Sequence, residues 1–255
     1  MSRHHDIPGT HEHMAWGYFD PAAEPVLRVA SGDTVGLSSF PAGNGSRLPE
    51  DRSIVPQAYL DALQMEQDLG PHFVTGPVHV EGAMPGDVLQ VDILTTVVDY
   101  DWGLTCILPE LGTLPEDFPG TTIIHPRVDR DRQVAILPWG TEIPLDPFFG
   151  IIAVAPPASE GRATTVVPRA FGGNMDNKEL RPGTTLYLPV FTEGALFFAG
   201  DGHGMQGDGE VCVTALETGV SGTFRLTVRK DLDYRMPFAE TDTHLISVGL
   251  NEDLD

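Results

Sequence analysis

A glycine-rich loop between residues 200 and 210 holds the residue types that could do chemistry. Its sequence is Gly-Asp-Gly-His-Gly-Met-Gln-Gly-Asp-Gly-Glu. Asp201 and His203 are two residues apart, so both side chains leave the same face of an extended chain. Asp208 and Glu210 repeat that spacing, and the glycines leave room for a ligand to approach closely. The loop therefore predicts four ligand-type groups that converge on one point.

Two simpler explanations account for this loop less well. A plain surface hairpin needs only about two to five loop residues and no histidine. A calcium loop of the helix-loop-helix type would place His203 at its third position and Gln206 where glycine is required. We therefore expect the loop to bind a metal ion or a small polar molecule.

Polar groups at two other places could join this site. Glu81 ends an apolar run just before a glycine turn, where proteins often present functional groups. Asn174, Asp176 and Lys178 follow a Gly-Gly pair, whose tight turn can aim an amide and a carboxylate into a cleft. A helix N-terminus capped by Asn174 or Asp176 is an equally good explanation of the second segment, and the two can hold together.

The chain contains two cysteines, Cys106 and Cys212. They are far apart and each lies in an apolar stretch, so the sequence indicates neither a disulfide framework nor a cysteine metal cluster. Cys212 could act as a nucleophile with Glu210 and Lys178, the combination that amidases of the nitrilase type use. Such a thiol needs an electropositive, accessible setting, whereas Cys212 stands between two valines. We therefore expect a buried, unreactive thiol.

Composition limits the partners of this protein. The 255 residues carry a formal charge of -22, spread along the chain rather than gathered in a tail. Such a surface disfavours nucleic acid and anionic membranes as partners. The sequence has neither a long apolar span nor a signal peptide, which predicts a cytoplasmic protein.

The elements that must position these groups are mostly strands. Gly and Pro, at 28 and 22 residues, punctuate short runs rich in Val, Ile, Thr and Phe, which is typical of a mainly β fold. One helix is expected over residues 56–70, where Pro56 suits the first turn and Gly-Pro ends it. Strands are expected at 26–29, 34–40, twice within 73–100, and at 133–137, 148–155, 163–167, 184–190, 196–199, 209–217, 223–228 and 244–248.

Several motifs together resemble the acetamidase/formamidase family. They are Gly-Pro-Val at 76–78, Val-Glu-Gly-Ala at 80–83, Pro-Gly-Asp at 85–87, Gly-Asn-Met-Asp-Asn-Lys at 173–178, Leu-Tyr-Leu-Pro-Val at 186–190, Gly-Ala-Leu-Phe at 194–197 and the glycine loop running on to Cys212. Combined motifs of this length are far more specific than a short pattern, and they extend over residues 25–229.

The resemblance implies a mainly β fold, a β-sandwich or barrel-like core with one helix and a smaller α/β subdomain near residues 100–160. It implies one catalytic unit over residues 1–255, with a further C-terminal segment expected beyond it. It also implies hydrolysis of short carboxamides such as formamide or acetamide to the acid and ammonia, a divalent metal, and a homo-oligomer of two or more subunits.

Carried over by position, the resemblance suggests a role for each candidate residue. Asp201, His203 and Glu81 are the expected metal ligands, with zinc as the expected ion and calcium as the alternative. Glu81, Asp208 and Glu210 are the candidate catalytic carboxylates, and Asn174, Asp176 and Lys178 are the candidate substrate-binding residues. Zinc suits the reaction because it polarises a carbonyl and lowers the pKa of its bound water.

Two other functions remain open on the sequence. One is an amidase that uses Cys212 as its nucleophile. The other is a noncatalytic β protein whose glycine loop only binds a small polar ligand or calcium. Turnover of amides, and the accessibility of Cys212 to alkylation, would distinguish them.

Overall fold

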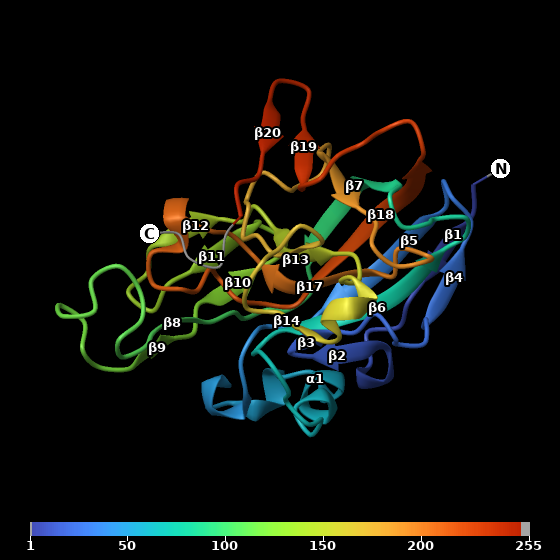
Figure 1. Ribbon diagram of the computed structural model, residues 1–255. Coiled ribbons are helices and arrows are strands. Elements are labelled where there is room, and N and C mark those ends of the chain that lie inside the picture. Colours follow the sequence, from blue (N-terminus) through green and yellow to red (C-terminus); the bar gives the residue numbers. More distant parts are fainter. Residues whose placement is uncertain (1, 251–255) are drawn as a thin grey trace.

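The computed structural model describes residues 2–250 and is mainly β, with two large sheets (Figure 1). The first sheet is seven-stranded, in the order β1 (His4–Asp6), β5 (Thr34–Ser39), β18 (Val220–Arg229), β7 (Val88–Val98), β16 (Thr185–Pro189), β19 (Phe238–Glu240) and β20 (Leu245–Ser247). Its neighbours pair antiparallel, except that β1 is parallel to β5.

The second sheet carries the glycine loop. Its order is β15 (Gly172–Asn174), β13 (Phe148–Ala153), β17 (Phe197–His203), β6 (Phe73–Val80) and β2 (Met14–Trp16), and β4 (Leu27–Val29) pairs parallel with β6. Strand β17 therefore lies between β13 and β6, so both edges of its backbone are hydrogen-bonded.

Aromatic side chains join the two sheets. Phe224 of β18 packs against Phe149 of β13 and Phe197 of β17, with ring centroids 5.2 and 5.5 Å apart. All three rings are buried in one apolar core. Large rings that meet between two sheet faces are what holds a β-sandwich together. The predicted mainly β class with a sandwich-like core is confirmed.

Period-two patterning is clearest in β7. Leu89, Val91 and Ile93 are buried, whereas Gln90 and Asp92 between them are partly exposed. One face of the strand thus packs on the core and the other lies against polar groups, as the alternation predicts.

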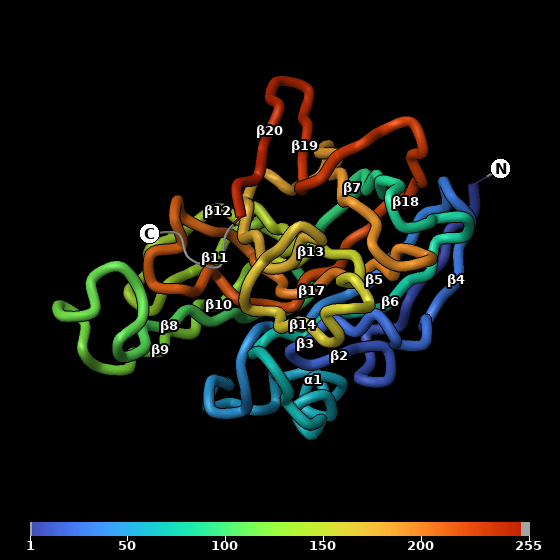
Figure 2. Tube along the Cα trace, viewed as in Figure 1, coloured from blue at the N-terminus to red at the C-terminus, as the bar shows by residue number. Residues whose placement is uncertain are grey.

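The structure describes every residue of the expected α/β part near residues 100–160. This part contains strands and irregular chain but no α-helix. These strands are β8 (Thr105–Ile107), β9 (Thr122–Ile124), β10 (Arg127–Asp129), β11 (Val134–Ile136) and β12 (Glu142–Pro144), together with β13; the helical residues are the short 3-10 turn η4 (Ala158–Glu160). The loop that joins β8 to β9, green in Figure 2, projects from one end of the molecule. Strands β3 (Tyr18–Phe19) and β14 (Ala163–Thr164) pair elsewhere.

The predicted helix is much shorter than expected. Helix α1 covers Gln57–Ala62, and Tyr59 and Ala62 are its buried residues. Tyr59 packs on Phe73 of β6, so the helix does lie against a sheet. Leu63 and Met65 just after the helix still pack on the core, but residues 66–69 are all exposed, including Leu69 at 46%. A helix without an apolar face to bury gains too little from packing to continue. The remaining helical turns are η1 (His11–His13), η2 (Gly45–Arg47), η3 (Arg52–Ile54) and η5 (Asp208–Glu210).

The prediction of a strand at residues 209–217 is wrong. The chain there forms η5 and then a loop in which Val211 and Val213 are exposed. Val213 has a φ of 63°, a conformation that β-branched residues rarely adopt and that breaks a strand. Cys212, expected to be buried between these valines, is partly exposed.

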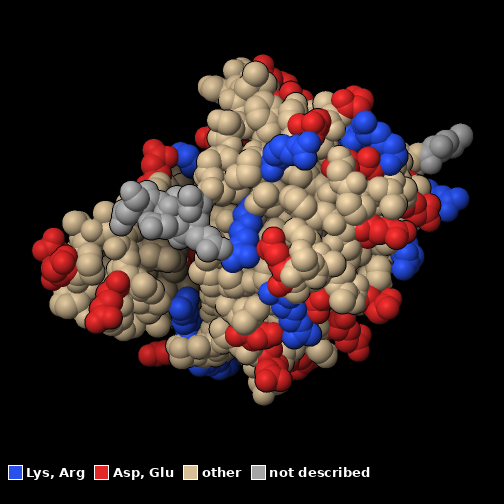
Figure 3. All heavy atoms as spheres, in the orientation of Figure 1, with Lys and Arg blue, Asp and Glu red and all other residues tan. Residues whose placement is uncertain are grey.

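Charge is distributed as the composition suggested. On the face shown in Figure 3, acidic side chains lie among basic ones rather than in a single patch. Among residues 2–250, no helix combines the length and the apolar character that a membrane span requires.

Candidate active site

Asp201 and His203 meet inside the protein, as their spacing predicts. Both lie at the end of β17, at 2% and 1% exposure. Nε2 of His203 is 3.3 Å from Oδ2 of Asp201. The register of β17 against β13 puts His203 opposite Phe148, whose ring edge packs on the imidazole at 5.0 Å. Strand pairing and this aromatic contact together fix the orientation of the histidine.

Two more carboxylates approach the same nitrogen. Oε1 of Glu217 is 3.4 Å from Nε2 of His203, and Oδ1 of Asp176 is 4.0 Å from it. Glu210 adds a fourth, because its carboxylate lies within 4.8 Å of ligand atoms of Asp176 and His203. We call Asp176, Asp201, His203, Glu210 and Glu217 the acidic cluster.

Sequence reasoning singled out neither Glu217 nor His72 as a site residue. Glu217 ends an apolar run just before Thr-Gly, which is the same signal that singled out Glu81. It reaches the cluster because its backbone forms an isolated bridge with His203. His72 lies just before β6, with Nδ1 3.0 Å from Thr165 Oγ1 and Nε2 3.9 Å from Asp201 Oδ2. His72 is therefore a second imidazole close to the carboxylate of Asp201.

Gly150 of β13 leaves the space in which these side chains meet. A Cβ at this position would lie 2.6 Å from Oδ1 of Asp176, 2.8 Å from Oδ2 of Asp201 and 2.8 Å from Cε1 of His203. No real Cβ tolerates such distances, so a side chain at 150 would displace the cluster. The glycine is therefore part of the construction of the site.

Several oxygens of the cluster are buried without a hydrogen-bond partner in the described part of the chain. They are Oδ1 of Asp176, Oδ1 of Asp201 and Oε2 of Glu217. Buried polar atoms are nearly always satisfied, so unsatisfied carboxylate oxygens that point into one cluster call for a donor or a cation. One imidazole nitrogen with several carboxylate oxygens is a ligand set that zinc accepts, and the oxygens also suit calcium. The residues present fit a divalent metal.

The second nitrogen of His203 is held by Gln206. Nδ1 of His203 lies 3.0 Å from Oε1 of Gln206, and Nε2 of Gln206 donates to the carbonyl oxygen of Asp176 at 2.7 Å. The amide of Gln206 is thereby oriented with its oxygen toward the ring, so Nδ1 carries the proton. A partner on the far nitrogen typically orients a ligating histidine, and this arrangement leaves Nε2 toward the carboxylates.

Burial and close charges shift the pKa values in the cluster in different directions. Burial raises the pKa of Asp176, Glu210 and Glu217 above their ordinary values. Burial acts on Asp201 in the same sense, but the imidazoles of His203 and His72 outweigh it and hold the pKa of Asp201 below its usual range.

Burial opposes the charged form of His203, yet the carboxylates of Glu217 and Asp201 raise its pKa well above the ordinary histidine value. Titratable groups whose pKa values are shifted in opposite directions are typical of catalytic and ligand-binding sites.

Glu81 does not join the cluster, so the prediction that it is a ligand beside Asp201 and His203 is wrong. It is exposed and follows the far end of β6, whose other end is the one that pairs with β17 near Gly200. An extended strand rises about 3.3 Å per residue, which puts Glu81 roughly 20 Å along the strand. Glu81 therefore lies at one end of the strands of this sheet, whereas Asp201 and His203 lie at the opposite end.

Asp208 also lies outside the cluster, contrary to the predicted convergence with Glu210. Its side chain is 90% exposed and pairs with Lys178 at 2.6 Å, so these two candidates satisfy each other at the surface. The φ of 78° at Gly209 turns the chain between Asp208 and Glu210, and so only Glu210 faces inward. Asn174 is partly buried, and its Nδ2 donates to the carbonyl oxygen of Val166 at 3.5 Å.

Neither cysteine has the neighbours of a nucleophile. Sγ of Cys212 contacts Oγ1 of Thr105 at 3.9 Å and Thr214 at 3.5 Å, groups that cannot act as a general base. Burial raises the pKa of the Cys106 thiol, which disfavours its reactive thiolate form. This geometry gives no support to a cysteine mechanism.

The sequence matches the profile of the Acetamidase/Formamidase family over residues 10–160 and 157–244. It is 32% identical over 191 residues to a formamidase of Methylophilus methylotrophus, a match that covers 55% of this chain and 47% of that protein. It is 30% identical over 203 residues to an acetamidase of Mycolicibacterium smegmatis, covering 56% and 50%. The chain thus spans about half the length of these curated relatives.

Solved structures show the same architecture. A predicted acetamidase/formamidase of Thermoanaerobacter tengcongensis superposes with a TM-score of 0.81 at 27% identity, covering 95% of this chain and 75% of that one. An acetamidase of Bacillus halodurans gives a TM-score of 0.78 at 29% identity, with 95% and 76% covered. The match extends over both large sheets, and hence over the strands that position the cluster.

Proposed function

Because this chain belongs to the Acetamidase/Formamidase family, we propose that it hydrolyses the C–N bond of carboxamides to the carboxylic acid and ammonia at the acidic cluster. The observation that carries the proposal is the position of Nε2 of His203, which lies 3.3 Å from Asp201 and 3.4 Å from Glu217. A buried imidazole between carboxylates with unpartnered oxygens is a site built for a charged or strongly polarised ligand.

We propose that Asp201, His203 and Glu217 hold a divalent metal, with zinc as the favoured ion and calcium as the alternative. Their ligand atoms lie within 4.8 Å of one another, and all three side chains are buried. When bound, such an ion supplies Lewis acidity for the amide carbonyl, which resonance makes a poor electrophile. Glu217 takes the place that the sequence assigned to Glu81.

Glu210 is the proposed proton carrier. It is partly exposed, unlike Glu217 and Asp201, and burial raises its pKa toward the range useful for proton transfer at neutral pH. In this role its carboxylate takes a proton from the attacking water while the C–O bond forms. It then gives that proton to the amide nitrogen as the C–N bond breaks, and ammonia leaves.

Asp176 is the proposed contact for the substrate amide. Its Oδ1 is buried, lacks a partner in the described residues and faces the cluster, so it can accept a hydrogen bond from an NH₂ group. Gln206 holds the Asp176 carbonyl and so fixes the backbone that carries it. Assembly as a dimer or higher oligomer and a cytoplasmic location stay predictions from the sequence.

Ammonia release tests the proposal. The purified protein is assayed with formamide, acetamide and propionamide, and its metal content is measured in parallel, for wild type and His203→Ala. His244→Ala, an exposed histidine, is the matched control. We expect turnover and bound metal in wild type and in the control, and loss of both in His203→Ala. Stabilisation by calcium with no turnover of any amide would instead identify a noncatalytic binding protein.

A further inference from the structure

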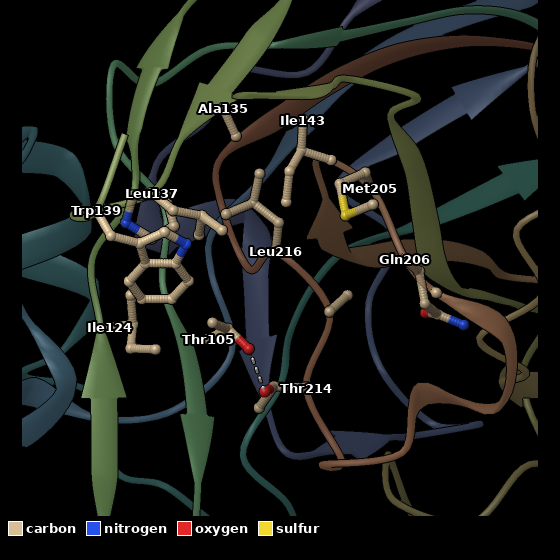
Figure 4. Close-up of a pocket in the computed structure, with 13 residues that line it drawn as sticks. Thr105, Ile124, Ala135, Leu137, Trp139, Ile143, Met205, Gln206, Thr214 and Leu216 are labelled. Atoms are coloured by element: carbon tan, nitrogen blue, oxygen red, sulfur yellow. Dashed lines mark hydrogen bonds between the residues drawn. The ribbon is translucent and has the colours of Figure 1, made fainter. Parts of the chain in front are cut away.

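Figure 4 shows an apolar cavity, which has a volume of about 270 Å³. Strands β9, β11 and β12 form one side, through residues such as Ile124, Ala135 and Ile143, and the segments 205–207 and 214–216 form the other. Its volume is close to the lower end of the range of about 300–1,000 Å³ that small-molecule pockets occupy. It is much larger than formamide or acetamide needs.

The two threonines and the glutamine in the wall of this cavity already have hydrogen-bond partners. Oγ1 of Thr105 and Oγ1 of Thr214 lie 3.0 Å apart, and Thr214 also bonds the backbone of Cys106. Both ends of the Gln206 amide are used, by His203 and by Asp176. An occupant therefore finds few free donors or acceptors here, so an apolar group suits the cavity best.

Two residues of the wall bond directly to the cluster. Gln206 lines the cavity, and its Oε1 is the partner of Nδ1 of His203. Ala215 lines it as well, and its backbone N–H donates to Oε1 of Glu217 at 3.0 Å. Gln206 and Ala215 therefore lie between the cavity and the cluster, so the two are separated by the thickness of one residue.

The rim carries a large side chain that a ligand could cover. Trp139, just beyond β11, is 64% exposed although it lines the cavity. Exposed tryptophan at the mouth of an apolar pocket gains free energy when an apolar chain packs against its ring.

We propose that this cavity receives the acyl chain of the substrate, so that the preferred substrates are primary amides of medium-chain or aromatic acids rather than formamide or acetamide. The inference rests on the proposed amide hydrolysis. The apolar chain would lie between Ile143 and Leu216, with the amide head directed to the Gln206 end, next to His203.

The first measurement is kcat/KM for a series of straight-chain amides from acetamide to hexanamide, with benzamide added. Burying one methylene raises kcat/KM by about fourfold where the pocket accommodates it. We expect hexanamide to exceed acetamide by at least about tenfold. A series in which kcat/KM stays flat or falls with chain length, while acetamide is turned over, overturns the inference and leaves the proposed function standing.

A matched pair of variants tests whether the acyl chain binds in this cavity. Ile143→Trp reduces the cavity, whereas Ile246→Trp alters an isoleucine of the same partial burial on β20, in the seven-stranded sheet. We expect the hexanamide-to-acetamide ratio of kcat/KM to fall about tenfold or more in Ile143→Trp and to keep its wild-type value in Ile246→Trp. An equal effect of both variants, or of neither, contradicts the assignment.

Binding of the product acid separates this inference from the proposed function. Calorimetry with hexanoate and acetate needs no turnover, so it tests the cavity even in a protein that hydrolyses no amide. Hexanoate that binds wild type more tightly than acetate, and Ile143→Trp more weakly than wild type, supports the cavity as an acyl pocket. Equal binding of both acids argues against it. A change of oligomeric state in Ile143→Trp, measured by sedimentation, would show instead that this face contacts a second copy of the chain.

Discussion

Nε2 of His203 lies 3.4 Å from Oε1 of Glu217, and both residues are buried. They are joined by an isolated β-bridge between the end of β17 and the chain that leads into β18. One residue of the pair belongs to the glycine loop and the other lies outside it. The centre of the site is thus made where the two large sheets come together, because β17 and β18 belong to different sheets.

This contact predicts that Glu217, and not Glu81, is needed for activity. Glu217→Gln keeps the size of the side chain and removes the charge facing His203. We expect kcat/KM for amide hydrolysis to fall by about 100-fold or more, because a group of the proposed metal site is lost. Glu81→Gln, the same change at an exposed glutamate, should keep activity within about twofold. A large loss of activity in Glu81→Gln, with little change in Glu217→Gln, would instead support the role that the sequence predicted for Glu81.

The turn at Gly209 predicts unequal roles for Asp208 and Glu210. Glu210→Gln removes the partly buried carboxylate beside Asp176 and His203, and we expect an activity loss of about 100-fold or more. Asp208→Asn breaks only the surface ion pair with Lys178, so activity should change by less than about threefold. Steady-state rates of ammonia release decide between them, and a large loss in Asp208→Asn would place the proton carrier at the surface.

The close approach at Gly150 predicts that one added methyl group damages the site. Gly150→Ala would put a Cβ within 2.8 Å of Asp201 and His203, so these side chains must move. Since displacement of about 1 Å can cost on the order of 100-fold, we expect kcat/KM to drop 10- to 100-fold. Gly120→Ala, where a Cβ meets nothing within 4 Å, is the control. Full activity in Gly150→Ala would show that the cluster is not the reacting centre.

Removal of the proposed metal should lower the thermal stability of the protein. A metal at a hundredfold excess over its Kd adds about 2.7 kcal/mol, or roughly 5–10 °C in Tm for a chain of this size. We expect a chelator to lower Tm by this amount in wild type, and by much less in Glu217→Gln, because a variant that lacks one of the proposed ligands binds little metal for the chelator to remove. Melting curves with and without chelator measure both. An unchanged wild-type Tm, with no metal found in the protein, would remove the metal from the proposal.

Asp33 gives a pH dependence of stability away from the site. The backbone N–H of Arg3 donates to its Oδ1 at 2.7 Å, and further hydrogen bonds come from His5 and Ala30. The bond from Arg3 contributes most to holding the pKa of Asp33 below its ordinary value. A carboxylate whose folded-state pKa is lowered stabilises the fold above its unfolded-state pKa of about 3.9, and this contribution is lost as pH falls through the folded-state value.

We therefore expect Asp33→Ala to lower the free energy of unfolding by about 1–2 kcal/mol at pH 6, and by clearly less near pH 3. Urea unfolding of wild type and variant at both pH values measures this difference. Asp131→Ala, at an exposed aspartate, should show a difference near zero at both. If the difference in the free energy of unfolding between wild type and Asp33→Ala is the same at both pH values, Asp33 acts through packing alone.

Much of the fold follows from local pattern. The alternation along β7 and the buried run of β13 predict strands because the period of side-chain burial belongs to the backbone itself. The predicted helix and the strand at 209–217 failed where local sequence carried the same apolar residues but the fold offered no surface to bury them, as Leu69 and Val211 show.

The sequence by itself predicted the pairing of Asp201 with His203, because residues two apart share a face wherever the chain is extended, and β17 does run through both residues. Only the tertiary structure decided which other groups meet them. Glu217 and Asp176 reach the imidazole through strand pairing between segments distant in the chain, while Glu81 and Asp208, equally suitable as residue types, are carried to exposed places. Ligand chemistry can be read from residue types, but convergence depends on long-range register, and a single sequence does not encode that register locally.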